Sequence, residues 1–379
     1  MRTYYLNEMK YSKLKYDGAE AMTALFDNGR KEMHAYLLPA STSDDAETQI
    51  NAICRAAGML ASDSGLTPVF KRFLLSDPSN QIFLLPEEDE CARSVVRQSL
   101  LDGRKAALMM ILEEGADFAD DGDGIWRDSN GRIWAGDNMS VLPADSHAMT
   151  IDYLESFGKT LAAHGASLKD HCLRTWFFVR DIDNNYAGVV RGRNEVFDRE
   201  GLTSDTHFIA STGIEGQCAQ PERLVAFNAF ADTKVSESQI RYLYGSTHLN
   251  PTSEYGVAFE RATAVDYADR RHVYISGTAS IDNKGEIVAP GDIKAQTLRM
   301  LENIGVLLEE GGCDWEDVAH MTVYLRDIAD RSVVSRMMEE RYPDIPKVIV
   351  LAPVCRPGWL IETECMAVKK TENPEYAPY

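Results

Sequence analysis

The chain of 379 residues is 44% hydrophobic and 26% charged, proportions that are typical of a soluble globular protein. Its formal net charge of −20 argues against nucleic acid as the main partner, because neutralising phosphates requires a basic surface. No apolar run reaches signal-peptide or membrane-spanning length, so we expect no membrane partner and a cytoplasmic location. A small anionic metabolite is compatible with the net charge, since a few arginines in a cleft can reverse the local potential.

The seven cysteines and eight histidines are scattered along the chain. No CxxC pair occurs, and an odd number of irregularly spaced cysteines favours free thiols in a reducing compartment over a disulfide framework. No two histidines stand at HxH or HxxxH spacing. We therefore expect neither a metal site nor a bound cofactor.

The first third of the chain opens with about 30 residues that show only weak patterning. The elements predicted beyond them are a strand at 34–42, a helix at 44–60, a strand at 67–77 and two strands within 92–112. Asp44 or Asp45 is expected to cap the helix, because a carboxylate ahead of the first turn can accept hydrogen bonds from its free N–H groups.

The middle third begins with an acidic, glycine-rich stretch at 115–124, which we expect to be a solvated linker. Its spacing lacks the ligand pattern of a calcium loop. Asn130-Gly131 within IWRDSNGRIW predicts a hairpin. The elements predicted after this hairpin are a helix at 147–164, a strand at 172–183, a helix at 184–199 and strands at 205–216 and 222–231.

The last third has the densest regular patterning in the chain. The elements predicted here are a hairpin formed by 259–265 and 272–281, a helix at 292–310, a strand at 320–330, a helix at 329–341 and strands at 347–354 and 359–368. The residues expected on the inward face of the first helix are Ile293, Leu298, Leu301, Ile304 and Leu308.

One pattern occurs three times: a helix, a short break, an apolar strand and an aspartate. The three strands are FKRFLLSD at 70–77, FFVRDID at 177–183 and VYLRDIAD at 323–330. A length of 379 residues allows three units of about 126 residues, which is an ordinary domain size. We predict an α+β protein of three tandem units, at 1–114, 115–235 and 236–379.

The third unit resembles the RidA/YjgF superfamily across the stretch SGTASIDNKGEIVAPGDIKAQTLRMLENIGVLLEEGGCDWEDVAHMTVYLRDIAD at 276–330. The resemblance implies a small chorismate-mutase-like α+β unit, of which three associate with ligand clefts between neighbours. Three such units in one chain would form an intramolecular pseudo-trimer, so we expect a monomer.

Two branches of this superfamily suggest different chemistry. Its imine deaminases carry an arginine at a position that falls at or next to Val348 here, within IPKVIVL, whereas the first unit has a similar motif around Arg93 in ARSVV. The segments VCRPGWLIETE and EYGVAFERAT are similar to the chorismatases. By this resemblance Glu362 matches the catalytic glutamate, Cys355 a subtype-specific active-site cysteine and Arg261 the arginine of the FxRA segment.

A general acid is the main requirement for removing pyruvate from chorismate, because the enol methylene must be protonated. Trp359, Leu360 and Ile361 flank Glu362, and desolvation raises the pKa of a carboxyl group. Glu364 follows two positions later on the predicted strand and should point to the same side. Cys355 could act as a nucleophile or as a steric wall.

Substrate carboxylates need cationic partners, for which arginine has the best geometry. The residues expected to contact substrate are Arg261, Arg326, Arg356, Tyr255, Tyr324 and Gly277. The leading hypothesis is a chorismatase-like enzyme that acts on chorismate or a related enolpyruvyl carboxylate. The alternatives are a RidA-like enamine or imine deaminase and a non-catalytic small-metabolite-binding protein.

Overall fold

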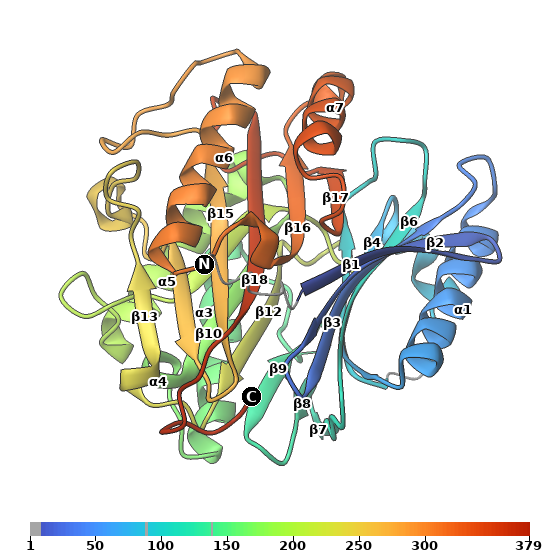
Figure 1. Cartoon of the computed structure of the whole chain (residues 1–379). Coiled ribbons are helices and arrows are strands. Elements are labelled where there is room, and N and C mark those ends of the chain that lie inside the picture. The colour runs from blue at the N-terminus through green and yellow to red at the C-terminus, as the bar shows by residue number, and fades with distance from the viewer. Residues whose placement is uncertain (1–8, 88–89, 138) are drawn as a thin grey trace, which may run out of the picture.

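The computed structural model describes residues 9–87, 90–137 and 139–379, which fold into three six-stranded mixed sheets with helices packed against them (Figure 1). The first unit contains β1 Met9–Tyr16, β2 Ala19–Asp27, β3 Lys31–Pro39, α1 Ala46–Ser64, β4 Thr67–Leu75, α2 Pro78–Gln81, η1 Ile82–Leu84, β5 Ala92–Arg97 and β6 Ala106–Glu113. The second contains β7 Ala119–Gly122, β8 Ile125–Arg127, β9 Arg132–Ala135, α3 Ser146–Ala163, α4 Leu168–His171, β10 Cys172–Val179, α5 Ile182–Glu200, β11 Ala210–Glu215 and β12 Val225–Asp232. The third contains η2 Glu237–Gln239, β13 Ile240–Leu243, η3 Thr252–Tyr255, β14 Ala262–Asp266, β15 Arg270–Ala279, α6 Ile293–Glu310, η4 Trp315–Asp317, β16 Val318–Leu325, η5 Ile328–Asp330, α7 Arg331–Arg341, β17 Lys347–Leu351 and β18 Ile361–Lys370.

The three sheets have the same topology. Their strand orders are β1-β2-β3-β6-β4-β5, β7-β8-β9-β12-β10-β11 and β13-β14-β15-β18-β16-β17. The fourth and fifth strands of each unit pair in parallel, whereas the other neighbours are antiparallel. The three predicted repeat strands are β4, β10 and β16. Each pairs with the sixth strand of its own unit, and each pairing skips one residue at the equivalent position. The predicted organisation of an α+β chain in three tandem units is confirmed.

The long helices form where the sequence pattern predicts them. The side chain of Asp45 accepts a hydrogen bond from the backbone N–H of Thr48 at 2.7 Å, which caps α1 as expected. Asp145 and Asp292 cap α3 and α6 in the same way. In Figure 1, α1 lies along the outer face of the first sheet, where its apolar stripe is buried. The inner faces of the sheets are thereby left to pack against one another.

The interior between the three sheets holds both aromatic rings and ion pairs. Rings from the first and second units are stacked, with 4.5 Å between the centroids of Phe70 and Trp134. Three buried ion pairs each join a different pair of units: Arg132–Glu113 at 2.6 Å, Arg174–Glu364 at 2.6 Å and Arg270–Glu32 at 2.9 Å. Each unit therefore contacts both of the others through the common interior.

Two expectations from the sequence are wrong, and one segment for which no element was predicted contains strands. The weakly patterned start contains β1 and β2; β1 is an edge strand whose residues are mostly exposed on both faces, so it lacks a two-residue hydrophobic period. The acidic stretch is not wholly a linker, because Ala119–Gly122 forms the exposed edge strand β7. Leu298 is 37% exposed rather than buried.

Two buried polar side chains explain why Leu298 lies outside the core. Gln296 donates to the carbonyl of Gly358 and accepts from the N–H of Leu360, and Asn303 donates to the carbonyls of Ala279 and Ile281. These hydrogen bonds fix the rotation of α6 about its axis. A count of apolar residues alone could not reveal them.

All seven cysteines are free thiols, as predicted from their spacing. No helix within the described ranges combines the length and the apolar composition that crossing a membrane requires.

Candidate active site between the second and third units

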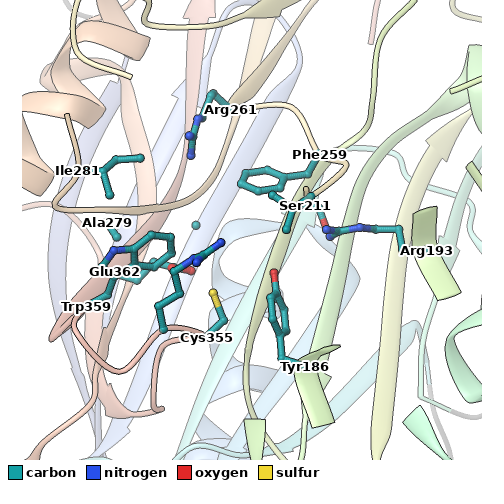
Figure 2. A pocket seen from close by; sticks show the side chains of 14 residues that line it. Tyr186, Arg193, Ser211, Phe259, Arg261, Ala279, Ile281, Cys355, Trp359 and Glu362 are labelled. Atoms are coloured by element: carbon teal, nitrogen blue, oxygen red, sulfur yellow. The ribbon is translucent and has the colours of Figure 1, made fainter. Parts of the chain in front are cut away.

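A pocket lies where β11 of the second unit runs beside β15 of the third (Figure 2). Its lining residues are Tyr186, Arg193, Ser211 and Gly213 from the second unit, with Val257, Phe259, Arg261, Gly277, Ala279, Ile281, Cys355, Arg356, Trp359 and Glu362 from the third. The two strands are joined by hydrogen bonds from the N–H of Ser211 to Ser276 Oγ at 2.9 Å and from the N–H of Gly277 to Thr212 Oγ1 at 3.0 Å. The pocket therefore exists only because two units of the chain meet.

Glu362, the predicted general acid, is a buried residue near the start of β18 and lines this pocket. Burial and the neighbouring Glu364 carboxylate raise its pKa to about 8, although Arg261 and Arg174 act in the opposite direction. A methyl group at Gly277 would lie 2.0 Å from Glu362 Oε1, so glycine is required there for this position of the carboxyl group. The carboxyl is consequently protonated in most molecules at pH 7.

The pairing of the fourth and sixth strands shows that this acid has no counterpart in the other two units. The residue pairs at the same register position are Tyr324–Glu362, Phe178–Ala226 and Leu74–Ala107. Alanine thus stands where the first and second units would carry the carboxyl group. Only the third unit provides an acid at this place in the sheet.

Glu364 is on the same side of β18 but does not line this pocket. Its carboxylate accepts hydrogen bonds from Arg174 Nη2 at 2.6 Å and from Trp176 Nε1 at 3.0 Å. Tyr324 also hydrogen-bonds to Glu364 and is fully buried. The expectation that Tyr324 orients the substrate is therefore corrected, because the phenol is directed to the interior carboxylate.

Cys355 lies half-buried at the pocket, close to Glu362 and Tyr186. Burial and the Glu362 carboxylate raise the pKa of its thiol to about 12; a hydrogen bond with Tyr186 and the charges of Arg356 and Arg193 do not offset this. The thiol is thus neutral near pH 7. Of the two roles considered from the sequence, this environment favours a wall over a nucleophile.

The three predicted arginines have different positions. Arg261 is buried at the pocket, where its Nε and Nη2 donate to the backbone carbonyl of Asn250 at 3.2 and 3.0 Å. Arg356 is exposed at the pocket, 5.4 Å from the centroid of the Trp359 ring. Arg326 does not line the pocket.

Arg326 instead joins the third unit to the second. Its Nη1 donates to the carbonyl of Val354 at 2.7 Å, and its Nη2 forms an ion pair with Asp183 on α5. The partner is thus a residue of the neighbouring unit, which the local sequence around Arg326 could not indicate. Tyr255 was also expected at the site; its backbone ends η3, but its side chain lies outside the described residues.

Helix α5 brings Tyr186 and Arg193 to the pocket, a contribution that is not among the expectations from the sequence. Arg193 is 1% exposed, and its Nε and Nη2 have no hydrogen-bond partner within the described ranges. The signal in the sequence was a charged residue on the apolar face of a predicted helix, between Val189 and Val196.

The resemblance to the deaminases puts their arginine at or next to Val348, and strand pairing shows which residues of the three units are equivalent there. The residues at this register position are Arg93 in β5, Ser211 in β11 and Lys347 in β17. The equivalent in the third unit is thus Lys347, next to Val348, and its ammonium group bonds Glu339 at 3.0 Å instead of lining this pocket. The residue that faces the Glu362 pocket from this position is Ser211 of the second unit.

The side chains that line the pocket include one carboxyl group, one thiol and three guanidinium groups. Across the described part of the chain, no group of three or more His, Cys, Asp or Glu residues is arranged to hold a metal ion. The side chains that line the pocket can transfer a proton from a buried acid and recognise an anion with guanidinium groups.

Comparisons with known proteins place the third unit in a family. The profile of the family described as endoribonuclease L-PSP matches residues 259–369. A RutC family protein of Pyrococcus abyssi is 35% identical over 100 residues, which are 26% of this chain and 79% of that protein. The 3-aminoacrylate deaminase RutC of Acinetobacter baylyi is 32% identical over 97 residues, which are 25% of this chain and 77% of that protein. The 2-iminobutanoate/2-iminopropanoate deaminase of Rattus norvegicus is 30% identical over 114 residues, which are 30% of this chain and 80% of that protein.

A likeness that extends over more of the chain comes from a solved structure. The crystal structure of a chorismatase superposes with a TM-score of 0.64 over 79% of this chain and 93% of that chain. The two sequences are 19% identical in this comparison, so the likeness concerns the fold alone. The sequence relatives above show that this chain belongs to the RidA/YjgF superfamily, and the structural likeness shows that it has the fold of a chorismatase.

Proposed function

We propose that the protein is a chorismatase-like enzyme that removes pyruvate from chorismate or a related enolpyruvyl carboxylate, with Glu362 as the general acid. The observation that carries the proposal is a buried carboxyl group whose pKa is raised to about 8 in a pocket between two units. The chorismatase-like fold supports it. The pKa matters because a general acid must hold its proton at the working pH.

The reaction would be a hydrolysis. Glu362 donates its proton to the methylene carbon of the enol ether, which leaves an oxocarbenium ion whose positive charge is shared with the ether oxygen. Water adds to this cation and returns a proton to the Glu362 carboxylate. The hemiketal carbon then breaks its bond to the ether oxygen that is attached to the substrate ring. This oxygen takes up the proton of the hemiketal hydroxyl, and pyruvate and an alcohol leave.

The other residues of the pocket would position the substrate. Arg261 and Arg356 provide positive charge for its carboxylates. Gly277 leaves the space that the Glu362 carboxyl occupies, and Cys355 forms a neutral wall beside it. None of these groups needs to change its protonation state for the acid to work.

A second candidate function, deamination of an enamine or imine, is favoured by the names of two relatives, which are deaminases. The arginine of those enzymes would correspond to Arg93, which lies in β5 of the first unit and away from the Glu362 pocket. Deamination would then use the junction of the first and second units. The two functions can therefore be separated by variants at Arg93 and Glu362.

The test is pyruvate release from chorismate, followed with lactate dehydrogenase and with identification of the aromatic or diene product. Wild type should release pyruvate, and Glu362→Gln should lose at least about 100-fold in kcat, the usual contribution of a general acid. Glu340→Gln, an exposed glutamate of α7 outside the pocket, is the matched control and should behave as wild type. No pyruvate over several hours would reject the proposal.

Two further outcomes identify the alternatives. Ammonia release from 2-aminoacrylate that depends on Arg93 and not on Glu362 would indicate a deaminase. Ligand-dependent melting shifts without turnover of either compound would indicate a binding protein.

A further inference from the structure

Arg193 is the most unusual charged residue of the pocket. Its side chain is 1% exposed, and both Nε and Nη2 are buried without a hydrogen-bond partner within the described residues. Figure 2 shows it pointing toward Ser211 and Phe259, and the guanidinium carbon is 5.8 Å from the centroid of the Phe259 ring. An aromatic ring face offsets only part of the cost of burying a cation.

The other pocket arginines differ from Arg193 in this respect. Nε and Nη2 of Arg261 are both bonded to Asn250, and Arg356 is exposed to solvent. Buried arginines elsewhere face carboxylates, as Arg132 faces Glu113 at 2.6 Å. Arg193 forms no ion pair with any described carboxylate, so its charge is available to an incoming anion.

The packing of α5 against α3 fixes the position of the backbone next to Arg193. A methyl group at Gly192 would lie 2.6 Å from the backbone carbonyl oxygen of His147, and one at Gly188 would lie 2.0 Å from Ser146 Oγ. The two helices α3 and α5 are thus in backbone contact next to Arg193. A buried unpaired cation costs folding free energy, and a site held in this way is typical of a ligand position.

The geometry of the unpaired atoms specifies the ligand. Nε and Nη2 lie on the same edge of the planar guanidinium group, so their N–H bonds can meet the two oxygens of one carboxylate. Phe259 and Trp359 line the same pocket and would contact the flat apolar part of a ring-bearing acid. A lone water molecule would leave the positive charge without a counter-ion.

We propose that Arg193, contributed by the second unit, is the residue that binds a planar carboxylate of a cyclic substrate in this pocket. The inference rests on the proposed function in that this carboxylate belongs to the molecule that Glu362 protonates. Arg193 then determines which acids are accepted, while Arg261 and Arg356 supply general positive charge.

The experiment measures binding of sodium benzoate to the full chain without turnover, by isothermal titration and by the shift of the melting temperature, with benzamide as the uncharged control. Wild type should bind benzoate and not benzamide. Arg193→Met should lose the benzoate-induced shift and should melt at a higher temperature than wild type in the absence of ligand, because an unpaired buried charge is removed.

Two more variants complete the design. Arg193→Lys keeps the charge but loses the paired N–H groups, so benzoate affinity should fall at least about tenfold. Arg336→Met on the exposed face of α7 should leave binding and melting unchanged.

Benzoate binding of wild-type strength in Arg193→Met would overturn the inference, and so would a wild-type protein that binds no benzoate. Should Arg193-dependent benzoate binding be found with a protein that does not convert chorismate, the proposed reaction fails and the carboxylate site stands.

Discussion

Glu362 is a carboxyl group whose ordinary acidity is changed by its position. Burial disfavours the charged form, and the fixed carboxylate of Glu364 adds repulsion, so its pKa is raised to about 8. The folded-state value lies above that of the unfolded chain. The protonated form is therefore the one that the fold stabilises, and this is the form a general acid requires.

This pKa predicts the pH dependence of the proposed reaction. Because the active form is protonated, kcat/KM should be constant from pH 6 to 7 and should fall by about tenfold per pH unit well above pH 8. Initial rates of pyruvate release between pH 5.5 and 10 would measure it, with circular dichroism to check that the fold persists. A rate that increases up to pH 9 would instead indicate that Glu362 works as a base.

The neutral thiol of Cys355 leads to a second prediction at this scale. With a pKa raised to about 12, the thiol holds almost no thiolate at pH 7, so Cys355→Ala should keep kcat within about tenfold of wild type. Iodoacetamide should modify it slowly for the same reason. Loss of activity as large as that of Glu362→Gln would show that the sulfur takes part in the reaction.

At the scale of elements, the position of α5 decides whether the pocket is complete. This helix carries Tyr186 and Arg193 and packs against α3 through the glycines of GVVRG at 188–192. Their missing side chains let the backbones approach, since the atom nearest Gly192 is a main-chain carbonyl that cannot rotate away.

Gly192→Ala should therefore lower the free energy of unfolding by about 1–3 kcal/mol and weaken benzoate binding, because α5 must shift away from α3. Urea denaturation and the benzoate titration would measure the two effects. Gly58→Ala is the matched control: this glycine lies in α1 with no atom near its Cβ direction, so alanine should stabilise the protein by about 0.5–1 kcal/mol. Equal effects of the two variants would contradict the assigned helix contact.

At the scale of the whole molecule, the three units have the same topology but different charges at equivalent positions. The residues at one such position, on the third strands opposite Glu113, Asp232 and Val368, are Glu32, Arg132 and His272. Glu32 accepts hydrogen bonds from Arg270 and His272 at 2.9 Å, and Arg132 bonds Glu113. Three identical subunits would bring like charges together here, whereas a tandem chain can place opposite ones.

Glu32 links the first unit to the third. Burial alone would raise its pKa, but the charge of His272 and hydrogen bonds from His272 and His34 outweigh burial and hold the pKa well below 4.5. A depressed carboxyl pKa gives stability that is present above pH 4.5 and is lost as the pH falls through the folded-state value.

Glu32→Gln should accordingly destabilise the protein by about 3–5 kcal/mol at pH 7.5, the usual cost of breaking a buried ion pair. The difference from wild type should become smaller as the pH is lowered below 4.5. Denaturant titrations at several pH values would measure it, with the exposed Glu340→Gln variant as control. A difference that grows on acidification would contradict the assigned charge state.

We also propose that the chain acts as a monomer, because each unit already meets the other two within one molecule. Gel filtration with light scattering should give a mass near 42 kDa at micromolar concentration. A stable trimer of chains would contradict this expectation.

The sequence by itself determined the helices, the central strands and the threefold repeat, because these depend on local periodicity and on apolar strands that end in the same residues. It also singled out Glu362 and Cys355, which lie within one short segment at the pocket. Periodicity failed where a strand is exposed on both faces, as in β1, and where buried polar residues occupy the inward face of a helix, as Gln296 does in α6.

Only the tertiary structure decided which arginines face the acid. Arg326 turns to Asp183 of the second unit, and Arg193 enters the pocket from a helix about 170 residues earlier in the chain. Contacts between units depend on how three sheets pack together, and no local pattern in the sequence records that packing. The same packing buries Glu362 beside Glu364, and this burial turns an ordinary glutamate into a candidate acid at neutral pH.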